Sequence, residues 1–200
     1  EMQRSLVGSE MCIRDRLRNE YKYLAHKFNL TPMDYRQWRF LRLRPQNFPH
    51  IRISQLAHLY YQRKAGLSQL VEAASVEDAK KVLATAVTPY WETHYTFGST
   101  SVRNDKNLSP FSLNLLCINT VVPILFAYGR HRGEEKYCDR AFDFLEQLRP
   151  ENNYIIRLWQ QSGLVVDNAG DSQALIQLKK EYCDKKECLR CRFGYEYLKL

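Results

Sequence analysis

The chain has few glycine and proline residues, eight and seven of 200, which excludes collagen-like and linker-like material. Its longest mostly apolar stretch, residues 113–128, contains Asn114, Asn119 and Pro123. Because this stretch is shorter than a membrane span, we predict no contact with a membrane. No P-loop, GxGxxG, GxSxG or HExxH pattern is present. Serine, histidine and aspartate also lack the spacing of a triad, so the sequence defines no reaction and no catalytic residue.

What is present is the composition of an ordinary globular domain. Apolar residues make up 44% of the chain and charged residues 26%. The 3 Trp, 13 Tyr and 9 Phe residues can fill a sizeable core. Lysine and arginine exceed aspartate and glutamate, giving a net charge of +8. This excess of positive charge weakly favours nucleic acid as a partner.

The first residues have neither helical nor strand periodicity. Residues 6–15 match the translation of a transposon sequencing adapter, and Arg16 fits the codon that the adapter leaves incomplete. We therefore predict that residues 1–16 are a non-native, disordered segment. The natural sequence would then begin near Leu17, as the C-terminal fragment of a longer protein. The missing N-terminal domain of that protein would be one of its partners.

Almost every later segment has apolar residues at helical spacing, which predicts an all-α fold. Residues 17–200 are predicted to form a single irregular helical bundle that ends in a Cys-rich tail. One short extended segment is expected near residues 90–97, where apolar and polar side chains alternate. Helix starts are predicted at three capping patterns: Thr31 to Asp34, Ser75 with Asp78, and Ser109-Pro110.

Two helices carry more specific expectations. The one opened by Thr31 should contain Tyr35, Trp38 and Leu41. The most apolar helix, after Ser109, should be kinked by Pro123, and Gly129 can end it. We expect this apolar helix to be central in the core.

The most specific feature is the spacing Cys183-x4-Cys188-x2-Cys191 at the end of the chain. Two thiolates of a CxxC turn can face one ion, and sulfur ligands suit zinc or iron–sulfur clusters. The spacing matches three ligands of the plant-type ferredoxin pattern. We predict a site for an iron–sulfur cluster or zinc, whose fourth ligand would be Cys138, Cys117, a histidine or a group outside the fragment. Alternatively, Cys183 packs as a small apolar residue and the other two are unligated thiols.

An odd number of native cysteines favours a reducing, cytoplasmic location over a secreted disulfide framework. Basic residues surround the cluster and would lower the thiol pKa values. A second basic run alternates arginines with aromatic residues, as single-strand binding surfaces do. Alternatively, its apolar residues fill the core and the arginine stems lie at the core's edge. The candidate nucleic-acid-binding residues in the two runs are Arg39, Arg42, Arg44, Lys185, Lys186 and Arg190.

Several phrases of the sequence together resemble a known family. They are residues 38–49, Tyr90-Trp91 followed by His94-Tyr95, residues 118–123 and residues 172–176. From Leu17 to the end, the chain resembles the C-terminal part of the domain-of-unknown-function family 2851, which is common in Bacteroidetes. The resemblance implies longer full-length members, and Cys183, Cys188 and Cys191 match the family's C-terminal cysteine pattern. It implies no activity and no catalytic residue.

These features favour a helical module that associates with nucleic acid and carries a cysteine metal site. The alternative is a metal-free scaffold or protein-interaction domain. An enzyme active site within this fragment ranks third.

Overall fold

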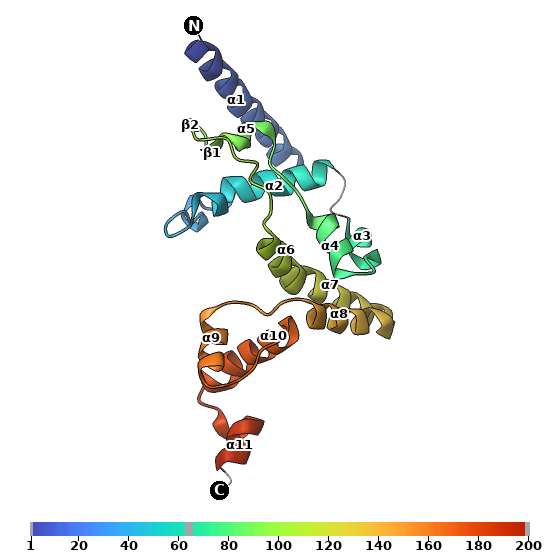
Figure 1. Ribbon diagram of the computed structural model, residues 1–200. Coiled ribbons are helices and arrows are strands. Elements are labelled where there is room, and N and C mark those ends of the chain that lie inside the picture. Colours follow the sequence, from blue (N-terminus) through green and yellow to red (C-terminus); the bar gives the residue numbers. More distant parts are fainter. Residues whose placement is uncertain (1, 63–65, 199–200) are drawn as a thin grey trace. The chain divides into compact units, whose positions relative to one another are not determined.

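The computed structural model describes residues 2–62 and 66–198 (Figure 1). It confirms the all-α class, because helices dominate and the described residues form only one small sheet. Contacts divide the chain into two compact units, residues 1–62 with 85–107 and residues 63–84 with 108–200. The two units are described separately.

The first unit combines helices with a hairpin. Its elements are α1 (Met2–Phe28), η1 (Tyr35–Gln37), η2 (Pro45–Asn47), α2 (Pro49–Tyr61), α5 (Pro89–Glu92), β1 (His94–Thr96) and β2 (Ser99–Thr100). Strands β1 and β2 pair antiparallel, with His94 opposite Thr100 and Thr96 opposite Ser99. Gly98 has φ +79° in the connection between them, where a left-handed residue is needed. The predicted extended segment is therefore half helix and half strand, because Thr88-Pro89 starts α5 before the strand begins.

Helix α1 is continuous through the boundary that we predicted at residue 17. The disorder predicted for residues 1–16 is therefore not observed for residues 2–16, which are helical. No proline occurs before Pro32, so nothing removes a donor from the helical hydrogen-bond ladder. Periodicity alone missed this part of the helix because its apolar residues do not form a stripe.

The helix predicted to start at Thr31 is absent. Asp34 accepts a hydrogen bond from the amide of Arg36 at 2.9 Å, which closes a turn two residues later and leads only into η1. Trp38 is extended, and Arg42 has φ +64°. Pro45 also disfavours helical backbone at the residue before it. Residues 38–44 therefore form an irregular segment without regular secondary structure.

A buried lysine holds the hairpin of the first unit against the following loop. The Nζ atom of Lys106 donates to the carbonyl oxygens of Trp91, Glu92 (2.9 Å) and His94 (3.1 Å). Gln55 of α2 donates to the carbonyl oxygen of Lys106 at 2.6 Å. Because Lys106 is only 4% exposed, its ammonium group is bound to these carbonyl oxygens and is not accessible to a partner in solution.

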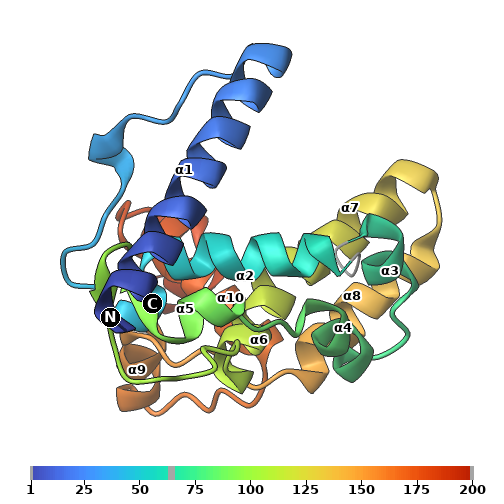
Figure 2. The same ribbon diagram turned by 90° about the horizontal axis from the view of Figure 1, so that it is seen from above.

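The second unit is wholly helical in its described part. Its elements are α3 (Leu67–Glu72), α4 (Val76–Leu83), α6 (Pro110–Leu116), η3 (Cys117–Val121), α7 (Val122–Arg132), α8 (Glu135–Gln147), α9 (Tyr154–Gln161), α10 (Ala169–Leu178), η4 (Lys179–Cys183), η5 (Cys188–Arg190) and α11 (Arg192–Leu198). Helices α7 and α8 pack along each other, and α3 and α4 lie beside them (Figure 2).

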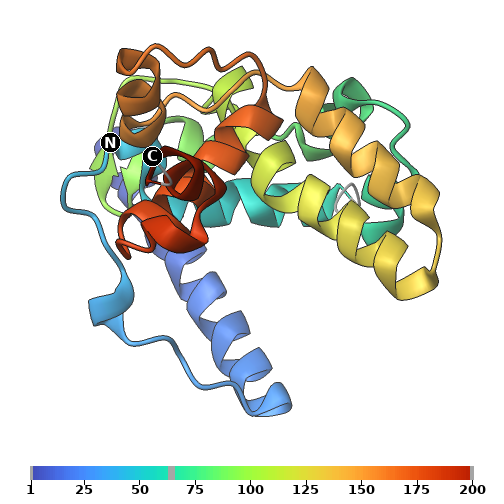
Figure 3. The same ribbon diagram turned by 90° about the horizontal axis from the view of Figure 1, so that it is seen from below.

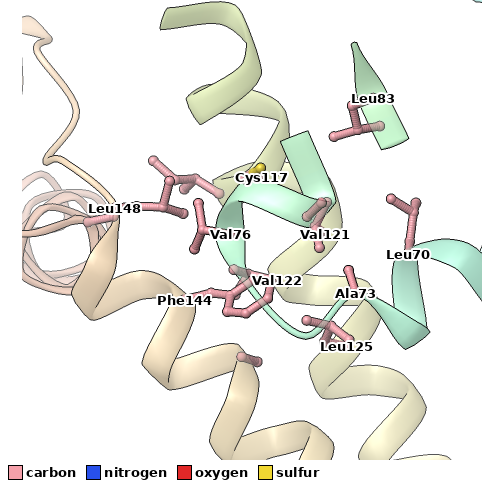
Figure 4. Close-up of a cluster of buried hydrophobic side chains, with 14 residues drawn as sticks. Leu70, Ala73, Val76, Leu83, Cys117, Val121, Val122, Leu125, Phe144 and Leu148 are labelled. Atoms are coloured by element: carbon pink, nitrogen blue, oxygen red, sulfur yellow. The ribbon is translucent and has the colours of Figure 1, made fainter. Parts of the chain in front are cut away.

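The core of the second unit lies between α4, η3, α7 and α8. Figure 4 shows Cys117, Val121, Leu125 and Phe144 pointing into one cluster. These four side chains are at most 1% exposed. The predicted capping patterns at Ser75 and Ser109 are both confirmed, since each hydroxyl accepts an amide hydrogen bond at 3.1 Å.

The apolar helix runs without a break from Pro110 to Arg132. A π-helical turn, η3, occurs just before Pro123, where a kink was predicted. Gly129 does not end the helix; Gly133 does, with φ +69°. By length and composition, this 23-residue helix could cross a membrane, because it is longer than the apolar stretch considered in the sequence. It also contributes three fully buried residues to the core, as a core helix does.

Candidate functional sites

The three C-terminal cysteines are placed by one compact backbone turn. Cys183 ends η4, Cys188 begins η5, and Cys191 is the last residue before α11. The amide of Glu187 donates to the carbonyl of Tyr182 at 2.9 Å, which returns the chain toward η4. The amide of Cys191 then donates to the carbonyl of Glu187 at 3.2 Å. Figure 3 shows these C-terminal segments in red, gathered beside α10.

Gly194 lets α11 lie directly on this turn. A Cβ atom there would meet the carbonyl oxygen of Cys188 and would lie 3.0 Å from its carbonyl carbon. Real Cβ atoms essentially never approach backbone so closely. The position of Cys188 against α11 therefore depends on a glycine at residue 194.

The three cysteines line one cavity of about 300 Å³. The remaining lining residues come from α9, the loop after it, α10, η4 and α11 and are almost all apolar: Trp159, Leu164, Leu175, Leu178, Tyr182, Phe193 and Gly194. Cys191 is buried, whereas Cys183 and Cys188 are exposed. The three cysteines of the predicted site therefore line the same apolar cavity.

The effect of nearby charge on these thiols differs from the prediction. Although Cys183 is exposed, partial desolvation, followed by the neighbouring Cys191, raises the pKa of its thiol, and Lys179 opposes this only in part. We had expected the basic residues to lower the thiol pKa values, and for Cys183 this was wrong. Desolvation disfavours the thiolate more than one lysine favours it.

Most of the surrounding basic residues have acidic partners. Lys179 pairs with Asp184 and Lys185 with Glu181. Arg190 pairs with Glu187 at 2.8 Å. The last two pairs link residues three or four apart on exposed backbone turns, where such pairs mainly support local structure. The positive charge near the thiols is therefore largely balanced locally.

Cys138 and Cys117 do not join the C-terminal thiols. Cys138 lies in α8 against Gly129 of α7, and its thiol faces the carbonyl oxygen of Phe126 at 3.7 Å. Cys117 is fully buried in the core, where burial raises its pKa to about 11. Neither lines the cavity. Among the described residues, no three or more His, Cys, Asp or Glu side chains are already arranged to hold a metal ion.

The arginine run of the first unit differs from the tail. Arg39, Arg42 and Arg44 are exposed and lie within the irregular segment of residues 38–44. Within residues 12–62 and 66–198, none of the three forms an ion pair with a carboxylate. Leu41 is 85% exposed and Trp38 is 37% exposed. The alternative in which the apolar residues of this run fill the core is therefore wrong for these two.

Beside these arginines lies a second pocket, of about 560 Å³. It is lined by Tyr35, Trp38, Phe40, His50 and Ile53. The His50 ring stacks on Trp91, with the ring centres 5.9 Å apart and the planes 22° apart. The ring centre of Phe40 lies 5.3 Å from that of His50. Aromatic packing therefore fixes the wall of the pocket.

His50 was not singled out by its sequence. Its Nδ1 atom is buried and has no hydrogen-bond partner in the described part of the chain. Burial lowers the pKa of this imidazole. No spacing pattern around residue 50 predicts that this imidazole is buried in an aromatic pocket, because Trp91, which packs against the ring, lies far away in the sequence.

The fold and the two pockets define a mostly helical protein with a thiol-lined cavity and a separate aromatic pocket beside unpaired arginines. The chain belongs to a family described as protein of unknown function (DUF2851), whose model matches residues 8–154. This confirms the family resemblance. The match begins within the segment assigned to an adapter, and it ends before the three cysteines. No curated protein and no solved structure matches the chain.

Proposed function

We propose that the second unit holds a metal centre, an iron–sulfur cluster or zinc, on Cys183, Cys188 and Cys191. The observation that carries this proposal is that all three thiols line one apolar cavity. Sulfur donors suit both kinds of centre, and an apolar surrounding is typical of sites that limit the access of water. Metal binding would require the three sulfur atoms to move to a common centre, because no three such ligands in the described residues are already arranged around one ion.

The donor set supports a centre with one position left for another ligand. Among the described residues, those that line the cavity include no further cysteine, and no histidine or carboxylate. A fourth ligand would thus come from a bound molecule or from another part of the full protein. Because partial desolvation raises the pKa of Cys183, binding must displace a proton from this thiol, and affinity for metal should rise with pH. Reduced thiols also support a cytoplasmic location.

Anaerobic purification of the full chain, with a visible spectrum and analysis for iron, sulfide and zinc, tests this proposal. We expect bound metal, with broad visible absorption for a cluster and none for zinc. Replacing Cys183, Cys188 and Cys191 together by serine should abolish binding. Cys12→Ser is the matched control, since Cys12 is also exposed but lies in α1. Metal-free protein would support the metal-free scaffold instead. Equal binding by the triple variant would show that other residues hold the metal and would overturn the site on these three cysteines.

A second function, binding of nucleic acid, is favoured by a separate observation in the first unit. Three exposed arginines, without acidic partners in the part of the chain that the structure describes, lie in the same segment as residues of an aromatic pocket. Arginines that are not neutralised by carboxylates can bind phosphates and release counterions. Lys185, Lys186 and Arg190 in the tail remain further candidates. Because Lys185 and Arg190 already have acidic partners, we expect them to contribute less.

Salt titrations of binding to single- and double-stranded DNA test this second function. Counterion release predicts that the affinity falls steeply as salt rises. Absence of binding at low salt would contradict nucleic-acid binding and leave the metal centre unaffected. Binding that is insensitive to salt would contradict the role of the arginines.

A further inference from the structure

The aromatic pocket of the first unit has two exposed rings, Tyr35 and Trp38, of which Tyr35 has the Arg36 guanidinium 5.8 Å from its ring centre. Tyr35 is 77% exposed and Trp38 is 37% exposed. Within the part of the chain that the structure describes, neither ring packs against another aromatic ring. Flat ring faces at the mouth of a pocket can stack on a planar ligand.

The inner wall of this pocket is rigid. His50 contacts Phe40, Trp91 and Phe97, with ring centres 5.3, 5.9 and 6.1 Å away. Phe40 also packs edge-on against Phe48 at 5.3 Å. Because several rings hold one another, the wall needs little ordering when a ligand binds, which favours affinity.

The charge around the pocket indicates an anionic ligand. Residues 31–53 contain five arginines and one carboxylate, that of Asp34. Arg52 is occupied within the protein, since it donates to Gln55 and Asn47. Arg39, Arg42 and Arg44 are exposed without carboxylate partners, as described above. A ligand that complements this surface combines a flat ring with phosphate groups.

We propose that this pocket takes an unpaired base of a single-stranded nucleic acid, stacked on Trp38 and Tyr35, while Arg39, Arg42 and Arg44 bind the adjoining phosphates. The inference rests on the nucleic-acid binding proposed above and names its substrate class. A base in a duplex has both faces covered by its neighbours, so only an unpaired base can stack here. The volume of about 560 Å³ lies within the usual range for small-ligand sites.

Substitutions of Trp38 in the full chain test the stacking. Binding of an oligothymidylate of about 12 nucleotides would be measured by fluorescence anisotropy. Trp38→Leu removes the ring and keeps an apolar side chain, and we expect affinity to fall about tenfold. Trp38→Phe retains a ring face and should stay within about threefold of the parent chain. Tyr61→Leu is the matched control, because Tyr61 is an exposed aromatic residue of α2 outside the pocket.

A comparison of ligands separates stacking from phosphate binding. An oligonucleotide of the same length made of abasic sites keeps the phosphates and lacks the bases. We expect it to bind about tenfold more weakly than oligothymidylate. A 2-aminopurine in the strand should lose fluorescence on binding the parent chain, and less on binding Trp38→Leu. Comparing an oligouridylate with an oligodeoxyuridylate of the same length then shows whether the 2′-hydroxyl affects affinity.

Each outcome has one meaning. Equal, salt-dependent binding of the abasic and normal strands would overturn the base pocket and leave nucleic-acid binding intact. No binding of any strand at low salt would overturn both. Stronger binding of duplex than of single strands, with no effect of Trp38→Leu, would also overturn the base pocket. Loss of affinity in the Tyr61→Leu control would show that the effect does not depend on the pocket.

Discussion

The first unit and the end of the second unit each hold a basic cluster next to a pocket, but the two clusters are built differently. In the tail, Lys185 and Arg190 pair with carboxylates three or four residues away. In the first unit, Arg39, Arg42 and Arg44 have no such partners in the described residues and follow irregular backbone. The sequence shows two similar concentrations of positive charge, whereas in the described residues the tail is largely paired with carboxylates and the three arginines of the first unit are not.

This difference affects what each pocket can bind. Around the thiols, locally paired charge and apolar lining favour a soft metal centre held by sulfur. Around the aromatic rings, unpaired arginines favour phosphate groups. The four predictions that follow separate metal binding at the thiols from phosphate binding at the arginines, beginning with the change of largest expected effect.

Replacing Lys106 by methionine should have the largest effect, and mainly on the first unit. The variant loses the ammonium group that serves three backbone carbonyls and leaves those carbonyls without this donor. We expect a loss of about 3 kcal/mol in the free energy of unfolding, measured by denaturant titration with tryptophan fluorescence. Binding of single strands should weaken, while metal content should not change.

Lys81→Met is the control for this prediction. Lys81 is 77% exposed by its side chain and forms only a surface pair with Asp78, so its replacement should change stability by less than about 0.5 kcal/mol. Equal effects of the two substitutions would contradict the role assigned to Lys106.

Replacing Gly194 by alanine should affect the other pocket. The new Cβ would meet the backbone of Cys188, which cannot move aside as a flexible side chain can. We expect about 2 kcal/mol of destabilisation and a clear loss of metal affinity, with unchanged binding of single strands. Gly66→Ala is a suitable control, since the nearest atom to its Cβ is 3.5 Å away. Normal metal binding by Gly194→Ala would show that the turn need not pack on α11.

The sequence could predict those features that local spacing determines. Ser75 and Ser109 cap helices because each hydroxyl needs only an amide three residues later. The three cysteines lie within nine residues, so one turn suffices to place them together. Thr31 to Asp34 has the same residue types as a helix start, yet the Asp34 carboxylate bonds to the amide of Arg36 instead.

The aromatic pocket could not be predicted in full, because it depends on contacts between residues that are distant in the sequence. Its wall joins Phe40 and His50 to Trp91 and Phe97, which lie between 41 and 57 residues further along the chain and meet them only through tertiary packing. The separation of Cys138 from the other thiols is equally non-local. A spacing pattern counts candidate ligands, but it cannot show that Cys138 packs against Gly129.

The two basic clusters can be compared directly by removing charge from each. Replacing Arg39, Arg42 and Arg44 by alanine should weaken single-strand binding about tenfold and lower the slope against salt by about 2. Replacing Lys185 and Arg190 by alanine should change affinity by less than about threefold, because each has an acidic partner. Both variants would be titrated at several salt concentrations. Equal losses would mean that the tail binds phosphate as strongly as the first unit.

The smallest effect concerns pH and the wall of the aromatic pocket. Burial lowers the pKa of His50 from its usual 6.5, so the folded chain binds this proton less readily than the unfolded chain. As pH falls below 6.5, the unfolded state gains a proton first, and stability decreases until the folded pKa is reached. Above pH 6.5 this contribution of His50 to stability is constant.

Because the ring is partly open to solvent, we expect a change in Tm of less than about 2 °C. His50→Phe should remove this part of the pH dependence, as thermal unfolding of both chains between about pH 5 and 8 would show. Identical pH profiles would mean that the imidazole is as well solvated in the folded chain as in the unfolded one.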